Sequence, residues 1–249
     1  MVRSVWLAFA MSVLLPTTLL AQTLEATLDA IISGVGEDER STWFAGEIVR
    51  VDGLIEEIVQ VFAAYPNATY QKLQDTDETA VYAIRFRNAE AERDLYAYLL
   101  LESGQWKLEA VRALFLPAFV QILLHQLAAI ETRTEEQEWQ YKNLLLMMSS
   151  DRVLKQHLLS NREAFEQIIN WPHDRDWSER DALLRSLYIE NTGKTEQNPF
   201  VRTFAIGGIL DNEVGYLHVP DGEDPPVIHQ SDLIYVEHVI GNWYVYKTT

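Results

Sequence analysis

Three histidines in the last part of the chain come nearest to a chemical site. Histidine changes charge near neutral pH and is the commonest metal ligand in proteins. Alternate residues of a strand share a face. If the strands that hold His218 and His238 pair, these two side chains approach each other, and His229 arrives on the connecting loop. One interpretation is a divalent metal site completed by Asp232 or Glu237, and the other is three scattered surface residues.

Aromatic side chains are dense over the same stretch of sequence. Tyr and Trp bury a large area and keep a polar group, so they are frequent both in cores and at binding interfaces. In a sheet with one covered face, both alternating sets cannot all be buried. Part of the set is therefore expected at the surface or under a helix, as a candidate binding surface. The set comprises Tyr216, Tyr235, Trp243, Tyr244 and Tyr246.

The sequence contains no motif for the other common catalytic or cofactor-binding chemistries. The chain has no cysteine, which excludes disulfides, thiolate zinc sites, iron–sulfur clusters and cysteine nucleophiles. It has no Gly-x-Ser-x-Gly, His-Glu-x-x-His, Walker or Gly-x-Gly-x-x-Gly pattern. Its many carboxylates single out no acid/base pair. The sequence therefore predicts no cofactor and identifies no catalytic residue, and it favours a non-enzymatic role.

The first residues have the pattern of a secretory leader. Arg3 precedes an apolar run over 5–15, Pro16 interrupts it, and Ala21 is a small residue suited to cleavage. The run is shorter than the ~18–20 apolar residues of a spanning helix. We therefore predict a signal peptide over residues 1–21 and a periplasmic or secreted protein, the alternative being an N-terminal membrane anchor.

The net charge of the chain limits the classes of partner that we expect. The 249 residues carry 37 Asp and Glu against 20 Lys and Arg, a formal net charge of −17. Such a surface repels phosphate backbones and anionic lipid. We expect no nucleic-acid partner and no stable membrane span after removal of the leader. A protein or another envelope component remains as the expected partner.

Periodicity predicts an α+β fold with two helix-plus-antiparallel-sheet units joined by helices. The first unit covers 23–131. It starts with a helix capped by Thr23 and a second helix from Ser41 to Pro66, and a four-strand meander covered on one side follows. The four strands are expected at 70–73, 80–87, 94–102 and 106–113.

The stretch 113–130 is the most apolar part of the chain after the leader. Gln121 and His125 within it argue against a lipid-facing span. We expect a buried helix that starts at Pro117, followed by a connecting helix within 132–149 that begins at Thr134.

The second unit covers 150–249. Three capped helices precede a loop at 193–199, and the strands 203–210, 214–219, 233–238 and 243–247 follow. Gly207-Gly208 inside a strand predicts a bulge or a close backbone approach. Gly241-Asn242 predicts a two-residue hairpin turn.

Four segments of the second unit form a recognisable series. They are Ser150-Asp151, Asn161 with Phe165-Glu166, the stretch 208–216, and Gly241-Asn242-Trp243-Tyr244-Val245-Tyr246. Through these segments the chain resembles a group of uncharacterised bacterial exported or lipoprotein-like domains, most strongly over 150–249. The resemblance implies export and this order of elements, and it carries no catalytic residue. This chain departs from the lipoprotein members because it lacks their cysteine.

These observations predict an exported binding or interaction protein of the cell envelope. Its candidate surfaces are the aromatic C-terminal strands and the region between the units near 117–125. The alternative is an envelope-associated hydrolase, or another small-molecule enzyme, with a His/carboxylate site. A pocket that holds two or more of His218, His229 and His238 with nearby carboxylates within ligand reach favours the enzyme. A shallow aromatic patch without convergent titratable groups favours binding.

Overall fold

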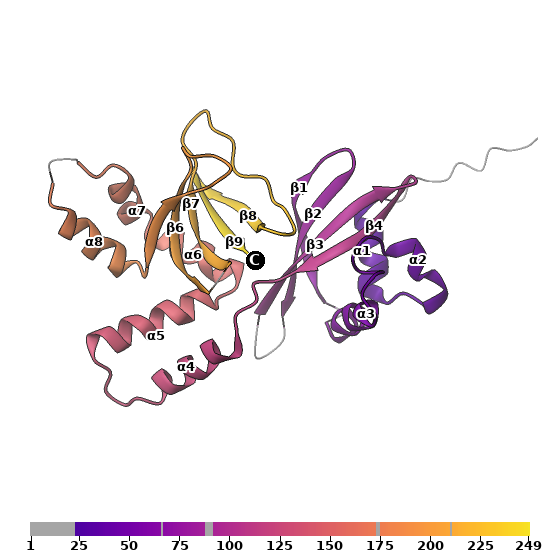
Figure 1. The fold of residues 1–249 in the computed structure, drawn as a ribbon, viewed down its shortest axis with the longest axis horizontal. Coiled ribbons are helices and arrows are strands. Elements are labelled where there is room, and N and C mark those ends of the chain that lie inside the picture. The colour runs from indigo at the N-terminus through magenta and orange to yellow at the C-terminus, as the bar shows by residue number, and fades with distance from the viewer. Residues whose placement is uncertain (1–22, 66, 88–91, 173–174, 210) are drawn as a thin grey trace, which may run out of the picture.

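The computed structural model describes residues 23–249 apart from 66, 88–91, 173–174 and 210. The predicted signal peptide of residues 1–21 lies outside the described residues. The described part contains eight α-helices and two antiparallel sheets of four and five strands. The predicted α+β class is confirmed. Figure 1 shows the first sheet on the right, the second on the left, and the C-terminus at the junction between them.

The first sheet is the predicted meander, with each strand antiparallel to the next. Three helices lie on its outer side in Figure 1. Thr23 caps the first of them, since its side chain accepts a hydrogen bond from the Ala26 N–H at 3.1 Å. The elements are α1 (Leu24–Ser33), α2 (Arg40–Trp43), α3 (Leu54–Ala64), β1 (Thr69–Asp75), β2 (Thr79–Arg87), β3 (Glu92–Glu102) and β4 (Gln105–Arg112).

The predicted helix from Ser41 to Pro66 is wrong as one element, because it is divided into α2 and α3. Gly46 and Gly53 both have positive φ, of 60° and 80°, which a helix interior does not tolerate. A Cβ on Gly46 would lie 2.4 Å from Cγ of Glu109 on β4. The backbone therefore approaches β4 closely at Gly46, and the chain between α2 and α3 is not helical.

The expectation that the first sheet is covered on one side is also wrong. Tyr82 and Ile84 of β2 are buried with the residues of α1 and α3, while Val81 and Ala83 are buried in a core shared with the second sheet. Strand β2 is thus buried on both faces, and one hydrophobic core spans the two units.

The second sheet has the order β5-β6-β7-β9-β8. The predicted loop at 193–199 is wrong in its first part, where strand β5 ends. The sequence did not indicate this strand because its polar residues lack the alternation that marks a strand. A register shift between Ala205 and Gly207 confirms the predicted bulge. Ile240 pairs with Trp243 across the predicted two-residue turn. The strands are β5 (Asn191–Lys194), β6 (Arg202–Ile209), β7 (Asn212–His218), β8 (Leu233–Ile240) and β9 (Trp243–Thr248).

Three helices accompany this sheet: α6 (Asp151–Ser160), α7 (Arg162–Ile169) and α8 (Trp177–Ser186). Phe165 of α7 is fully buried and contacts the rings of Tyr216 and Trp243, with centroids 5.1 and 5.2 Å apart. These aromatic contacts fix the helices on the sheet.

A helical hairpin links the two units and lies below the second sheet in Figure 1. It consists of α4 (Ala118–Ala128) and α5 (Glu135–Met147), and Thr134 forms the predicted capping box with Gln137. The Asn143 side chain of α5 donates a 2.5 Å hydrogen bond to the carbonyl of Ile206 on β6. Helix α4 packs on α5. In the described chain, no helix combines the length and apolarity that a membrane span requires.

Candidate functional site

The two sheets meet through stacked tyrosines. The rings of Tyr96 on β3 and Tyr235 on β8 lie 4.8 Å apart at 23°, and both side chains are fully buried. Nearby, the Tyr98 hydroxyl donates a 2.9 Å hydrogen bond to the carbonyl of Ile234. Aromatic burial and directed hydrogen bonds together fix the relative position of the units.

A buried ion pair lies beside these rings. Lys247 Nζ on β9 donates to Asp151 Oδ1 at 2.6 Å, and the two side chains are 5% and 0% exposed. The Tyr96 hydroxyl donates to the same oxygen at 2.8 Å. The ammonium also lies 5.7 Å from the ring centroids of both Tyr96 and Tyr235, within the range of a cation–π interaction.

A second carboxylate faces the pair from β3. Asp94 Oδ2 accepts a 2.8 Å hydrogen bond from the backbone N–H of Asp151, the first residue of α6. Burial, and then the charge of Asp151, raise the pKa of Asp94 to about 6. Asp94 therefore changes its protonation state at mildly acidic pH.

A cavity of about 300 Å³ opens beside this cluster. We call it the junction cavity. Asp94, Ser150 and Lys247 line it on the side of the cluster, and its other polar lining residues are Glu92, Arg93, Gln121 and Ser149. Ser150 stands at the N-cap of α6, yet its hydroxyl does not cap the helix. The Ser150 Oγ and Asp94 Oδ1 atoms are buried and have no hydrogen-bond partner among the described residues.

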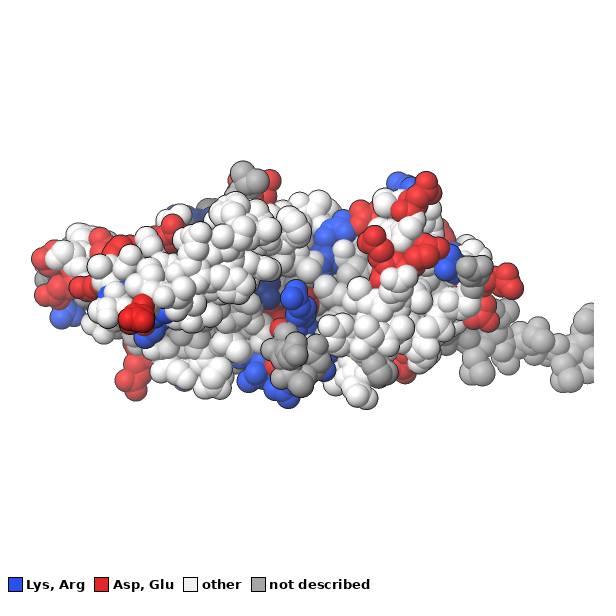
Figure 2. All heavy atoms as spheres, turned by 90° about the horizontal axis from the view of Figure 1, so that it is seen from below, with Lys and Arg blue, Asp and Glu red and all other residues white. Residues whose placement is uncertain are grey.

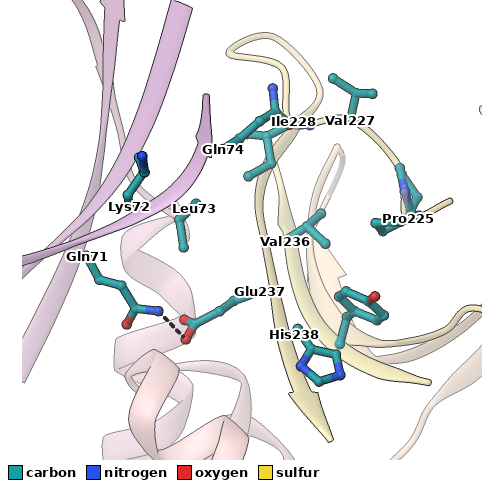
Figure 3. A pocket seen from close by; sticks show the side chains of 12 residues that line it. Gln71, Lys72, Leu73, Gln74, Pro225, Val227, Ile228, Val236, Glu237 and His238 are labelled. Atoms are coloured by element: carbon teal, nitrogen blue, oxygen red, sulfur yellow. Dashed lines mark hydrogen bonds between the residues drawn. The ribbon is translucent and has the colours of Figure 1, made fainter. Parts of the chain in front are cut away.

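A separate groove of about 380 Å³ lies between strand β1 and strand β8, under the 225–228 segment (Figure 3). Figure 3 shows Gln71 of β1 facing Glu237 of β8, with the hydrogen bond between them. Glu237 also accepts from Lys155 Nζ at 2.5 Å and from the Tyr235 hydroxyl at 2.6 Å.

Burial acts to raise the pKa of Glu237, but the hydrogen bonds from Lys155 and Tyr235 outweigh it, and the pKa lies below its ordinary value. Arg85 Nη2 adds a contact at 3.4 Å. The carboxylate is ionised and well supplied with donors. Through these hydrogen bonds the groove floor is a contact between the two sheets.

Helix α4 and Phe115, two residues before Pro117, expose a row of large apolar side chains. We call this row the α4 face, and it consists of Phe115, Phe119, Ile122 and Leu123, which are 70%, 56%, 56% and 39% exposed. The predicted buried helix is therefore only partly buried. Figure 2 views the molecule from below, the side on which α4 lies in Figure 1, and shows a broad area there with few charged side chains.

A cavity of about 260 Å³ adjoins the α4 face, between α4 and α5. We call it the hairpin cavity. Phe119 and Leu123 line it from α4, and Leu144 and Met147 line it from α5. Phe119 and Leu123 belong to both the α4 face and the hairpin cavity, so the two are continuous, and the lining of the cavity also includes the polar residues Gln140, Asn143 and Glu190.

The predicted aromatic binding surface lies mostly in the core. The side chains of Tyr216, Tyr235, Trp243 and Tyr246 are at most 2% exposed. Among these aromatics only Tyr244 is partly exposed, and it lines the groove between the strands β1 and β8. Two covered faces explain this result, because helices and the first unit bury both alternating sets.

The predicted histidine cluster does not form. Strand β9 lies between β7 and β8, so the strands of His218 and His238 do not pair. His218 pairs with Trp243 and His238 with Tyr244, which places the two rings on opposite faces of the sheet. His229 is hydrogen-bonded to Ser231.

The same holds for the wider metal hypothesis. No group of three His, Asp or Glu side chains in the described part of the chain is arranged to hold a metal ion. Asp232 and Glu237, the predicted partners of the histidines, belong to a turn and to the β1–β8 groove.

Sequence reasoning missed His157 of α6. Its Nδ1 lies 2.8 Å from the Tyr216 hydroxyl, and the two rings stack 5.9 Å apart at 17°. Burial lowers the pKa of His157 to about 4, so the ring is neutral near pH 7. The only sequence signal was its position on the apolar side of α6, four residues from Asn161.

Sequence reasoning also missed the junction cluster, which consists of Asp94, Asp151 and Lys247. These residues are far apart in the chain and share no motif. Only the packing of the two sheets brings them together.

Comparisons with protein-family models, with curated proteins and with solved structures gave no match for this chain.

Proposed function

We propose that this chain is a non-enzymatic binding protein of the cell envelope and that the α4 face is its contact surface. The observation that carries the proposal is the exposure of Phe119, Ile122 and Leu123 on helix α4 and of Phe115 just before it. A contiguous exposed apolar patch of this kind is typical of an interaction site. The absence of charge on the patch is what a desolvated interface core requires.

A protein partner fits the α4 face better than a membrane does. Residues 113–130 contain no Lys, Arg, Asp or Glu, and the whole chain carries a net charge of −17. Interfacial helices hold anionic membranes through a basic polar face, which this segment lacks. Anionic lipid would instead repel the acidic body.

The hairpin cavity indicates what the partner presents. It adjoins Phe119 and Leu123 and is lined on its other side by Leu144 and Met147. An apolar side chain of the partner would fill it, as anchor residues of protein interfaces fill pockets at the centre of a patch. The proposed occupant is therefore a different protein that inserts a large aliphatic or aromatic side chain between α4 and α5.

Site-specific photo-crosslinking tests the proposal. A photoreactive phenylalanine at position 119 should give one discrete adduct in cells, and the same group at Val49, which is 51% exposed on the first unit, should not. The adduct is identified by mass spectrometry and the complex is rebuilt from purified components. A rebuilt complex supports the proposal, and an adduct pattern that is equal at both positions contradicts it.

Matched variants give the second measurement. Ile122→Asn and Val49→Asn each remove an exposed branched side chain, 56% and 51% exposed, so each should change stability by less than about 0.5 kcal/mol. Only Ile122→Asn should weaken the rebuilt complex. Sedimentation equilibrium that shows a dimer through α4, or flotation with phosphatidylglycerol vesicles that depends on Ile122, would replace the proposed partner with a second copy or a membrane.

A further inference from the structure

We propose that the junction cavity binds a small molecule with a protonated primary amine on an apolar stem. The cavity lies between the start of β3, the segment 113–116, the turn before α6, and Lys247. It is distinct from the α4 face, and the proposal does not depend on the protein partner.

The unsatisfied atoms define the polar end of the ligand. Asp94 Oδ1 and Ser150 Oγ are both buried and lack a partner in the described chain, and Ser150 is only 8% exposed. Leaving such acceptors unpaired costs free energy. An ionised carboxylate accepts only, and a hydroxyl also accepts. A group that supplies several donors at once, such as an ammonium, satisfies both atoms.

The charges in the cavity also favour a cation. Asp94 and Asp151 carry two negative charges when ionised, and Lys247 supplies one positive charge through its 2.6 Å contact with Asp151. Within this buried cluster one negative charge remains. At the rim, Glu92, paired with Arg152 at 3.1 Å, and the exposed Arg93 also line the cavity with opposite charges. Buried charges are normally paired, so a bound cation completes the cluster.

The rest of the wall defines the stem. Leu95, Leu114, Leu116 and Met148 line the cavity beside its polar groups. A volume of about 300 Å³ is at the lower end of the range of small-molecule sites. An apolar stem the size of a short alkyl chain or one aromatic ring matches this lining.

Calorimetric titration of the full chain at pH 7.5 tests the site. The first probe is 2-phenylethylamine, and its neutral control is 2-phenylethanol, which keeps the stem. The amine should bind at least tenfold more tightly than the alcohol. A second probe, the methylamide of Nα-acetyl-lysine, distinguishes a free small amine from a lysine side chain of a partner protein. If the natural ligand is a partner's lysine, this probe should bind as tightly as 2-phenylethylamine. If the ligand is a free amine, it should bind more weakly.

Two variants place the binding in the cavity. Asp94→Asn and Ser150→Ala should each reduce amine affinity, the first at least tenfold, while Asp181→Asn on α8, an exposed carboxylate, should leave it unchanged. If Asp94→Asn fails to fold, the amine affinity of Ser150→Ala still tests the proposal. Equal affinities for amine and alcohol, no heat at millimolar amine, or equal effects of Asp94→Asn and Asp181→Asn would overturn the proposal.

The pH dependence supplies an independent measurement. Asp94 faces Asp151 and Lys247, with Arg85 and the rim residues Glu92 and Arg93 nearby. Because the pKa of Asp94 is about 6, lowering the pH from 7.5 to 5 protonates its carboxyl and should reduce amine affinity about tenfold, while both probes stay protonated. Affinity that is constant across this interval would contradict the assignment of Asp94 as the acceptor.

Discussion

Replacement of Lys247 by methionine should destabilise the protein more than almost any other charge removal. The change keeps the apolar stem of the side chain but leaves Asp151, which is fully buried, without its 2.6 Å cationic partner. The Tyr96 hydroxyl remains as a donor, yet it carries no charge. Breaking a buried pair in this way costs about 3–5 kcal/mol.

The assay is urea and thermal unfolding followed by circular dichroism. Because both sheets contribute to one core, we expect a single transition. For a chain of this size, 1 kcal/mol shifts Tm by about 2–4 °C, so Lys247→Met should lower Tm by about 6–20 °C. The control is Lys72→Met. Lys72 pairs with Asp75 at 2.7 Å, but both side chains are about half exposed, so its loss should cost less than about 1 kcal/mol.

The double variant Asp151→Asn with Lys247→Met isolates the cause. It removes both charges, so it should recover much of the stability that Lys247→Met loses. A loss below about 1 kcal/mol in the single variant would refute the reasoning that the pair is desolvated. A double variant less stable than the single one would show that packing, and not charge, sets the cost.

Three further changes have defined outcomes. The folded-state pKa of Asp94, about 6, lies above the unfolded value of about 3.9, so Asp94 binds its proton more tightly in the folded state. Its contribution to stability falls by up to about 3 kcal/mol as pH rises from 4 to 6, and Asp94→Asn should abolish this slope in urea titrations. The pKa of His157 is lowered to about 4, so its contribution has the opposite sign. Stability falls by up to about 3 kcal/mol as pH drops from 6.5 to 4, and His157→Gln should remove that loss. Gly46→Ala introduces a Cβ against Glu109 at a φ of 60° and should cost more than about 1 kcal/mol, measurable as a lower urea midpoint.

Local signals predicted the elements whose causes are local. The meander was recognisable because its strands alternate and are separated by turn residues, and the starts of α1 and α5 because Thr23 and Thr134 cap them. The polar strand β5 was not predicted, because it is a strand through its pairing with β6 and has no strand pattern in its own sequence.

Packing between distant segments was not predictable in the same way. Alternation places Tyr82 and Val81 on opposite faces of β2, but it does not say what covers each face. For the same reason the rings of Tyr216 and Trp243 were open to two interpretations, and burial under α7 decided between them. The histidine hypothesis failed on strand order, since no local signal places β9 between β7 and β8.

The junction cluster is hard to explain as a device for stability alone. Replacing a buried ion pair by apolar residues of similar size is often neutral or stabilising. Here the buried oxygens Asp94 Oδ1, Ser150 Oγ and Asp151 Oδ2 also have no hydrogen-bond partner among the described residues. A cluster that served only to join the sheets would be better filled with apolar side chains, like the rest of the shared core. Asp94→Leu combined with Asp151→Leu and Lys247→Met should therefore keep or raise stability while it abolishes amine binding. If the triple variant unfolds, the cluster fixes the position of the sheets and its polar groups are structural.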